Sequence, residues 1–320
     1  MRFVTVEHAG RTAAGVLDDG RVYLFDDETT VLDLVRSGLE AAKEAGASVL
    51  TTQPAVPFDQ VRLRPPLQPP TLRDFVAFEE HVEGIVKSVS PDAVVVEEWY
   101  AAPTFYFTNP HAIVGPGDEV AVPPGCRELD FELEVAAVVG RDGTTLAPAE
   151  AEEHIFGYTI LNDWSARDLQ RVEMRVGLGP AKGKDFASSL GPSLVTADEL
   201  ETFRDADGFL ALALTVTVNG EEIGRDLASN MGWPFRDLVA YASRGTWVRA
   251  GDVLGSGTCG NGGCLAELWG RRGQKDPPAL QPGDVVELNV EGLGTLTNIV
   301  VAGRDAPAIP PARRRPRSRP

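Results

Sequence analysis

The chain has 320 residues, 43% of them hydrophobic and 24% charged, which is the composition of an ordinary water-soluble globular enzyme. Its formal net charge of −17 argues against binding to nucleic acid or to an anionic membrane surface. Three cysteines are too few for a disulfide framework, and no uninterrupted apolar stretch approaches the ~18–20 residues of a membrane helix. Because the N-terminus also lacks the apolar core of a signal peptide, we predict a cytoplasmic protein.

Residues 1–65 are predicted to form a small α+β unit. The sequence Asp18-Asp19-Gly20 is typical of a hairpin turn between two short strands. Thr30 is expected to cap a helix that ends at Gly46. The proline-rich stretch 54–70 is interpreted as an extended linker that contains the domain boundary. The strands expected in this unit are Arg2–Glu7, Ala13–Leu17 and Arg21–Phe25.

Residues 66–305 are predicted to form one strand-dominated domain with frequent glycine and proline turns. Because its strands outnumber its helices and do not alternate regularly with them, we predict an α+β fold and not a doubly wound nucleotide-binding fold. Expected strands are Ala112–Val114, Glu119–Val122, Phe131–Val139, Gly157–Leu161, Leu212–Val218, Asp252–Gly255, Leu265–Trp269 and Val285–Val290, and expected helices are Pro148–Glu153, Ser165–Gln170 and Pro234–Ser243. Residues 306–320 carry five arginines among prolines and are predicted to be a disordered, solvated tail, with binding to nucleic acid or a partner as the alternative.

The strand expected after Asp130 carries an unusual acidic pattern. Asp130, Glu132 and Glu134 would share one face of it, and both faces become apolar toward Val139, as in an interior strand. Neighbouring buried carboxylates repel each other and resist desolvation unless a cation lies between them, and a hard divalent metal ion is the simplest such cation. The alternative is a solvated Glu-x-Glu face at the edge of a sheet.

Three further segments concentrate polar groups that are costly in a core and useful in a site. They are Arg73–His81, Asn162–Gln170 with its continuation to Lys184, and Gly255–Leu268. Together with the Glu-x-Glu strand, these segments resemble the fumarylacetoacetate hydrolase family. The stretch Asn-Asp-Trp-Ser-Ala-Arg-Asp at 162–168 is a long and specific match to that family.

The resemblance covers roughly residues 74–301 and implies a fold and a cofactor. The family has a mixed β-roll catalytic domain, a divalent metal ion and usually a homodimeric assembly. The implied metal ligands are Glu132, Glu134 and Asp163, with Asp74 as a further ligand in longer members. An all-carboxylate set favours Mg²⁺ or Mn²⁺, with Ca²⁺ also compatible, over zinc. For Asp163 the alternative is a helix N-cap, because Ser165 follows closely.

The resemblance also implies a catalytic pair. His81 lies seven residues after Asp74, where the family has its catalytic histidine, and the carboxylate that pairs with that histidine corresponds to Glu267. In such a dyad the carboxylate orients the imidazole, which then removes a proton from water. The alternatives are a surface histidine on a helix for His81 and an exposed strand position for Glu267.

Five more residues match positions that contact the substrate in this family. Arg167, Gln170 and Lys184 match groups that polarise substrate oxygens and stabilise oxyanions, and the alternative is a solvated, ion-paired surface. Tyr106 matches a substrate-contacting tyrosine, and Thr258 matches a threonine near the substrate carboxylate.

Some positions depart from the family pattern. Met174 and Ser90 stand where members that hydrolyse fumarylacetoacetate itself have a tyrosine and an arginine, so we expect a different substrate. Cys259 and Cys264 lie in a glycine-rich loop; because Cys126 and a stray histidine would complete a poor zinc set, we expect plain loop cysteines.

The predicted function is that of a metal-dependent hydrolase acting on C–C bonds in ketonic substances. It would cleave an acylpyruvate-like 2,4-dioxo acid through a metal-stabilised enolate, with the His81–Glu267 dyad activating water. The alternative reactions on the same metal site are decarboxylation of an oxaloacetate-like acid, hydration of a 2-oxo acid, and isomerisation or tautomerisation. A non-catalytic binding protein on the same scaffold is the more distant alternative.

Overall fold

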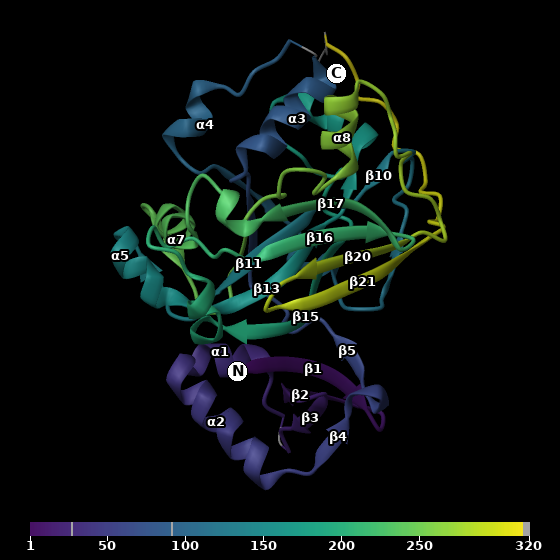
Figure 1. Cartoon of the computed structure of the whole chain (residues 1–320). Coiled ribbons are helices and arrows are strands. Elements are labelled where there is room, and N and C mark those ends of the chain that lie inside the picture. The colour runs from purple at the N-terminus through teal and green to yellow at the C-terminus, as the bar shows by residue number, and fades with distance from the viewer. Residues whose placement is uncertain (27, 91, 316–320) are drawn as a thin grey trace, which may run out of the picture.

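One large sheet runs through the molecule and joins the N-terminal unit to the rest of the chain (Figure 1). The structure is a computed structural model that describes residues 1–26, 28–90 and 92–315. In spatial order the sheet contains β4 (Ala55–Pro57), β3 (Arg21–Leu24), β2 (Arg11–Asp18), β1 (Arg2–His8), β15 (Ser188–Thr196), β13 (Ile155–Asp163), β11 (Leu133–Val139), β19 (Val253–Gly255), β6 (Leu72–Phe75) and β7 (Phe105–Thr108), while β5 (Arg62–Arg64) pairs with β1 and β8 (Ile113–Val114) with β15.

A second sheet packs against the first, and short helices surround both. Its order is β17 (Glu221–Leu227), β16 (Ala213–Val218), β20 (Val285–Val290), β21 (Gly294–Val301) and β9 (Glu119–Ala121). Two small pairs are β10 (Leu129–Asp130) with β14 (Ser165–Ala166) and β12 (Gly143–Thr144) with β18 (Trp247–Val248). The helices are α1 (Val31–Ser37), α2 (Leu39–Thr52), α3 (Glu79–Val89), α4 (Glu97–Ala101), α5 (Pro148–Ala151), α6 (Arg167–Glu173), α7 (Phe235–Ser243) and α8 (Leu265–Arg272).

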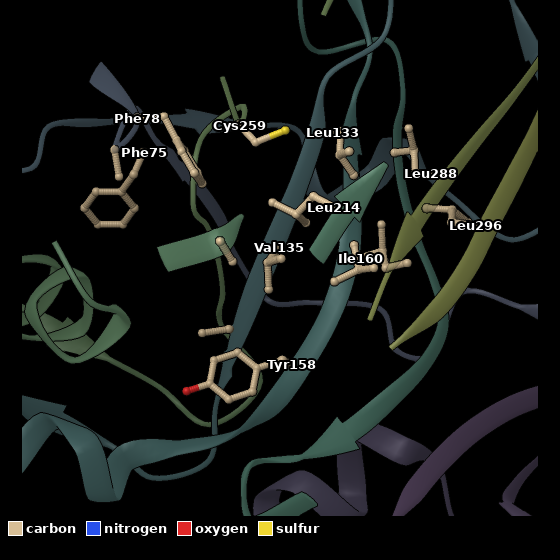
Figure 2. Close-up of a cluster of buried hydrophobic side chains, with 14 of the residues drawn as sticks. Phe75, Phe78, Leu133, Val135, Tyr158, Ile160, Leu214, Cys259, Leu288 and Leu296 are labelled. Carbon is tan, nitrogen blue, oxygen red and sulfur yellow. The ribbon is translucent and has the colours of Figure 1, made fainter. Parts of the chain in front are cut away.

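The main hydrophobic core lies between the two sheets. Figure 2 shows Val135 of β11 and Ile160 of β13 in one cluster with Leu214 of β16 and Leu288 of β20. All four side chains are buried, and full burial of such a side chain stabilises a fold by roughly 1.5–3 kcal/mol. The strands that carry the acidic pattern are therefore held rigidly from one side.

A second cluster covers the opposite face of the large sheet. Ala136 and Val138 of β11 pack there with Val35 of α1 and Ala42 of α2. Because β11 pairs with β13 on one side and β19 on the other, all seven of its residues are buried. The predicted interior strand is confirmed, and so is the strand-rich α+β fold class with a small N-terminal α+β unit.

Two of the three turn and helix-end predictions in the N-terminal unit are confirmed. The hairpin turn is confirmed, with Asp19 at φ 43° and Gly20 at φ 69° between β2 and β3. Thr30 caps α1 through a capping box with Asp33. The predicted helix end at Gly46 is wrong, because the chain breaks at Gly38 with φ 89° and a second helix then runs to residue 52.

The role of Gly46 is close packing and not termination. A Cβ atom there would lie 2.1 Å from Met1 Sδ and 3.3 Å from the ring of Phe3, so glycine lets α2 lie directly on β1. The proline-rich stretch is also more ordered than a linker, since it contains β4 and β5, which pair with β3 and β1. The boundary at residue 65 stays a prediction.

Most strands expected in residues 66–305 are found, with ends displaced by no more than two residues. Strands β6, β7, β15, β17 and β21 are not among those expected from the sequence. Residues 306–315 contain no helix or strand and are exposed, whereas the last part of the predicted tail, residues 316–320, lies outside the described residues. Within the part of the chain that the structure describes, no helix is long and apolar enough to cross a membrane.

Replacing Gly157 by Ala is expected to destabilise the fold by about 1–3 kcal/mol, because overpacking would force β13 away from β15. The added Cβ would lie 2.1 Å from the carbonyl oxygen of Val195, a backbone atom that has no room to move within the sheet. Urea unfolding measures the change. Gly117→Ala is the control, because its Cβ meets no atom within 4 Å and it costs only the strain of φ 74°. Equal losses in the two variants would contradict the steric explanation.

Candidate functional site

Buried carboxylates from three strands lie on one face of the large sheet. Glu134 alternates with Ala136 along β11, so both point to the face that α1 and α2 cover. By the same alternation, Asp74 of β6 lies on this face with Leu72, and Asp163 of β13 with Leu161, all in or beside the second cluster. Three strands of one sheet thus bring together acids that are far apart in the sequence.

Glu132 reaches the same place from irregular backbone. The strand expected to start at Phe131 starts at Leu133, and Glu132 lies in the break between β10 and β11. Its backbone N–H donates to Asn162 Oδ1 at 2.9 Å, and its carbonyl accepts from the backbone N–H of Asp163 at 3.3 Å. The break is therefore fixed to the end of β13.

The carboxylates lie close together, are buried from solvent, and do not all have hydrogen-bond partners. Oxygen atoms of Asp74, Glu132 and Glu134 lie within 4.8 Å of one another, and the three residues are at most 4% exposed. Asp74 Oδ1 and Asp163 Oδ1 are buried and have no hydrogen-bond partner among the residues that the structure describes. Burial and the charge of Asp163 raise the pKa of Asp74 to about 8, and burial with Asp74 raises that of Glu134. Carboxylates short of positive charge fit a hard divalent cation such as Mg²⁺ or Mn²⁺.

Gly255 leaves the space in which the acids meet. It lies on β19, between β11 and β6, opposite Ala136 on one side and Asp74 on the other. A Cβ atom here would lie 2.6 Å from Asp74 Oδ1 and 2.7 Å from Glu134 Oε2. Any side chain at this position would therefore push the two carboxylates apart.

Two buried cations neutralise part of this charge. Lys184 Nζ lies 2.5 Å from both Glu132 Oε2 and Asp163 Oδ2, and Arg167 Nη2 lies 2.7 Å from Glu132 Oε1. Burial acts to raise the pKa of Glu132, but Lys184 and Arg167 outweigh it and lower the pKa. The Lys184 and Arg167 side chains are less than 7% exposed, and their contacts with Glu132 put both cations directly at the acidic cluster.

The remaining predicted contact residues also reach the cluster. The Tyr106 hydroxyl on β7 donates to Asp163, and burial raises the pKa of that phenol well above its usual value. The buried Thr258 hydroxyl lies 3.5 Å from Glu134 Oε1. Half-buried Gln170 on α6 accepts a hydrogen bond from Arg167 Nη1 at 3.2 Å.

His81 lies at the edge of the cluster in a neutral state. It belongs to the first turns of α3 and is 7% exposed. Burial lowers the pKa of its imidazole to about 3, with the positive charges of Arg167 and Lys184 acting in the same direction against Glu132. The ring is therefore uncharged near pH 7. The alternative of a surface histidine does not fit this burial.

Glu267 lies on a helix and not on the expected strand. The interpretation of Leu265–Trp269 as a strand is wrong, because these residues open α8. Their apolar positions follow the helical spacing i, i+3, i+4, and Cys264 Sγ caps the helix by accepting from Glu267 N at 3.4 Å. Glu267 is fully buried, against the expected alternative of an exposed position.

The predicted dyad is not joined by a hydrogen bond in this structure. Glu267 instead contacts Arg271 Nη2 at 3.0 Å and accepts from Gly262 N at 3.4 Å, and burial raises the pKa of its carboxyl to about 7. The helices that carry the two residues pack closely, since a Cβ on Gly84 would lie 2.3 Å from Glu267 Cγ. The dyad therefore stays a prediction.

Asp130 is a site residue to which the sequence pattern alone gives no role. Its carboxylate accepts from Arg167 Nε at 2.8 Å and from the backbone N–H groups of Leu265 at 2.8 Å and Ala266 at 3.0 Å. One buried acid thus fixes both the arginine and the start of α8, which suits the positive end of a helix. The acidic alternation Asp-x-Glu-x-Glu was the available signal.

Replacing Gly255 by Ala is expected to weaken divalent-metal binding at least about tenfold, because the methyl group would displace Asp74 and Glu134. Isothermal titration with Mn²⁺ measures the affinity. Gly10→Ala, a turn position with no atom within 4 Å of the added Cβ, is the control. Unchanged Mn²⁺ affinity in Gly255→Ala would show that the metal ion does not bind at this cluster.

In metal-free protein the free energy of unfolding is expected to fall as the pH rises from about 4 to about 8. The pKa of Asp74 is about 8 in the folded chain, against about 3.9 in an unfolded chain. The stabilisation from the retained proton is complete below the unfolded pKa and is lost as the pH rises through the folded pKa. Urea unfolding at several pH values in chelator tests this, and Asp74→Asn should flatten the slope. A slope identical to wild type would contradict the raised pKa.

Comparison with known proteins identifies the family to which this chain is similar. The profile described as "Fumarylacetoacetate (FAA) hydrolase C-terminal" matches residues 71–301. Oxaloacetate tautomerase YisK of Bacillus subtilis is 28% identical over 319 residues, covering 93% of this chain and 99% of that protein. The human mitochondrial oxaloacetate tautomerase FAHD2A is 35% identical over 192 residues, covering 59% of this chain and 56% of that protein.

Solved structures agree with this assignment. A fumarylacetoacetate hydrolase from Exiguobacterium antarcticum superposes with a TM-score of 0.75 at 29% identity, covering 94% of this chain and 99% of that one. A 5-carboxymethyl-2-hydroxymuconate delta-isomerase from Mycobacterium smegmatis gives 0.67 at 26% identity, covering 94% and 100%. Named relatives thus include tautomerases, hydrolases and isomerases. The chain belongs to the fumarylacetoacetate hydrolase family of metal-dependent enzymes, as a member distinct from fumarylacetoacetase itself.

Proposed function

We propose that this protein is a divalent-metal-dependent hydrolase that cleaves a C–C bond in an acylpyruvate-like 2,4-dioxo acid. The observation that carries the proposal is the buried carboxylate cluster with two cations at its edge. Asp74, Glu132, Glu134 and Asp163 are the proposed ligands of Mg²⁺ or Mn²⁺, which when bound would supply positive charge beside the oxygens of a 2-oxo acid.

The two cations serve the charge that develops during cleavage. Breaking a C–C bond between carbonyl groups leaves an enolate, whose negative charge must be stabilised. Lys184 and Arg167 are buried, charged and held by short ion pairs, so they need little reorganisation to face that charge. Gln170, which accepts a hydrogen bond from Arg167, is proposed to orient the same substrate oxygens.

Hydrolysis also needs a base for water. His81 is buried and neutral, and in the proposed reaction it takes the proton of the water that attacks the distal carbonyl. Glu267, with a pKa of about 7, lies on the adjacent helix and is proposed to receive or balance that proton. In this proposal substrate binding closes the gap between the two residues.

Tautomerisation of oxaloacetate is a second candidate. Similarity to the Bacillus subtilis oxaloacetate tautomerase extends over 93% of this chain. The absence of a hydrogen bond between His81 and Glu267 among the described contacts also favours it, because moving a proton between carbon and oxygen of one substrate needs no activated water. The same cations would stabilise the same kind of enolate.

Turnover of acetylpyruvate and of oxaloacetate separates the candidates. Purified protein with Mg²⁺, with Mn²⁺ or with chelator is incubated with each substrate, and products are followed by NMR. Acetate and pyruvate, formed only with metal, would support the hydrolase. Faster equilibration of enol and keto oxaloacetate without cleavage of acetylpyruvate would replace it by the tautomerase.

Replacing His81 by Ala is expected to lower kcat for acetylpyruvate cleavage by about 10²–10⁴-fold, the usual contribution of a general base. His111→Ala is the matched control, because this histidine is exposed on a 3-10 turn. Steady-state kinetics measures both variants. A variant that keeps wild-type kcat would exclude His81 as the base.

The homodimer implied by the family resemblance is part of the proposal as well. Light scattering of the purified protein measures its mass in solution against the 34.3 kDa of one chain.

A further inference from the structure

A second group of metal-ligating side chains lies beside the carboxylate cluster. A nitrogen of His81, an oxygen of Glu132 and the Cys264 sulfur all lie within 4.8 Å of one another. They come from α3, from the break before β11 and from the residue that caps α8. All three are buried, with exposed fractions of 7%, 4% and 0%. This set differs from the carboxylate cluster in chemistry, because it offers one sulfur, one nitrogen and one oxygen.

The spacing of these atoms suits tetrahedral coordination. Cys264 Sγ lies 3.8 Å from His81 Nδ1. Bonds of about 2.3 Å to sulfur and about 2.0 Å to nitrogen at a tetrahedral angle place those two ligand atoms about 3.5 Å apart. A shift of a few tenths of an ångström would therefore bring both atoms to bonding distance of one ion.

The residues around the set hold two of its ligands in place. Glu132 is fixed by Arg167 at 2.7 Å and Lys184 at 2.5 Å, and Cys264 accepts the Glu267 backbone N–H at 3.4 Å. Outer contacts of this kind orient the ligands of metal sites. Three protein ligands with a fourth position left for water are the usual number in open zinc sites.

We propose that His81, Cys264 and Glu132 form an inhibitory site for Zn²⁺, which shares Glu132 with the Mg²⁺ or Mn²⁺ cluster and differs from it in its nitrogen and sulfur ligands. Thiolate and imidazole ligands favour Zn²⁺ over hard cations, and the thiol releases its proton to solvent when the ion binds. The inhibitory effect rests on the proposed function, because the ion takes the imidazole nitrogen that would otherwise accept a proton from water. Binding itself does not depend on that function.

The three ligands of this site come together only in the folded chain, because they are far apart in the sequence. In the sequence, Cys259 and Cys264 have only Cys126 and a distant histidine to complete a zinc set, so the pattern favours plain loop cysteines. Cys259 lies in the main hydrophobic cluster with Phe78 and Leu133 (Figure 2), whereas Cys264, which also belongs to this cluster, meets His81 and Glu132. The partners of Cys264 are 183 and 132 positions away along the chain.

Cobalt is a spectroscopic probe of this site. Full-length protein is saturated with Mg²⁺ and titrated with Co²⁺, whose bond to a thiolate gives a charge-transfer band in the near ultraviolet that carboxylate ligands do not give. We expect this band in wild type, its loss in Cys264→Ser and its displacement by Zn²⁺. Serine can still cap α8, and circular dichroism checks the fold. Cys259→Ser is the matched control and should keep the band.

The site is overturned if wild type gives no thiolate band or if Cys264→Ser keeps it. His81→Ala gives a second test, because it should weaken Co²⁺ binding at least about tenfold while the thiol remains. In turnover assays, Zn²⁺ should inhibit wild type and Cys259→Ser, and Cys264→Ser should need at least about 100-fold more Zn²⁺, each relative to its own zinc-free rate. A thiolate band without inhibition would uphold the binding site, overturn its inhibitory role and count against His81 as the base.

Discussion

The crowding of buried carboxylates on one face of the large sheet is the constraint on which the rest of the site depends. Like charges taken out of water repel each other strongly, and the raised pKa values of Asp74 and Glu134 show that cost. Lys184 and Arg167 offset part of it through short ion pairs. The orphaned oxygens of Asp74 and Asp163 are the part that a divalent cation would satisfy.

The fold holds this arrangement by packing both faces of the same strands. On one face, Val135 and Ile160 lock β11 and β13 against the second sheet. On the other face, the N-terminal helices cover Ala136 and Val138. Glu134, two residues before Ala136 on β11, is the first acid beyond this apolar region. Because β1 pairs with β15, the N-terminal unit is part of the large sheet and is not joined to it by a linker alone.

Asp130 and Cys264 connect the acidic cluster to helices α3 and α8. Asp130 binds both Arg167 and the start of α8, while Cys264 caps α8 and contacts His81. A change at the start of α8 would therefore move the arginine, the histidine and Glu267 together. The thiol of Cys264 lies beside the carboxylate cluster, so two sets of possible metal ligands with different chemistry share Glu132.

The sequence by itself determined the family, the strand-rich fold class and the acidic alternation of β11, because these depend on local periodicity and on a long specific stretch at 162–168. It misread Leu265–Trp269 as a strand, since five residues are too few for their helical spacing to exclude a strand. The contacts of Asp130 and Cys264 with the start of the helix exist only in the folded chain. Only the tertiary structure decided that Gly255 makes room for the acids, and that Cys264 meets His81 and Glu132. Those contacts join residues more than a hundred positions apart, and no local pattern encodes them.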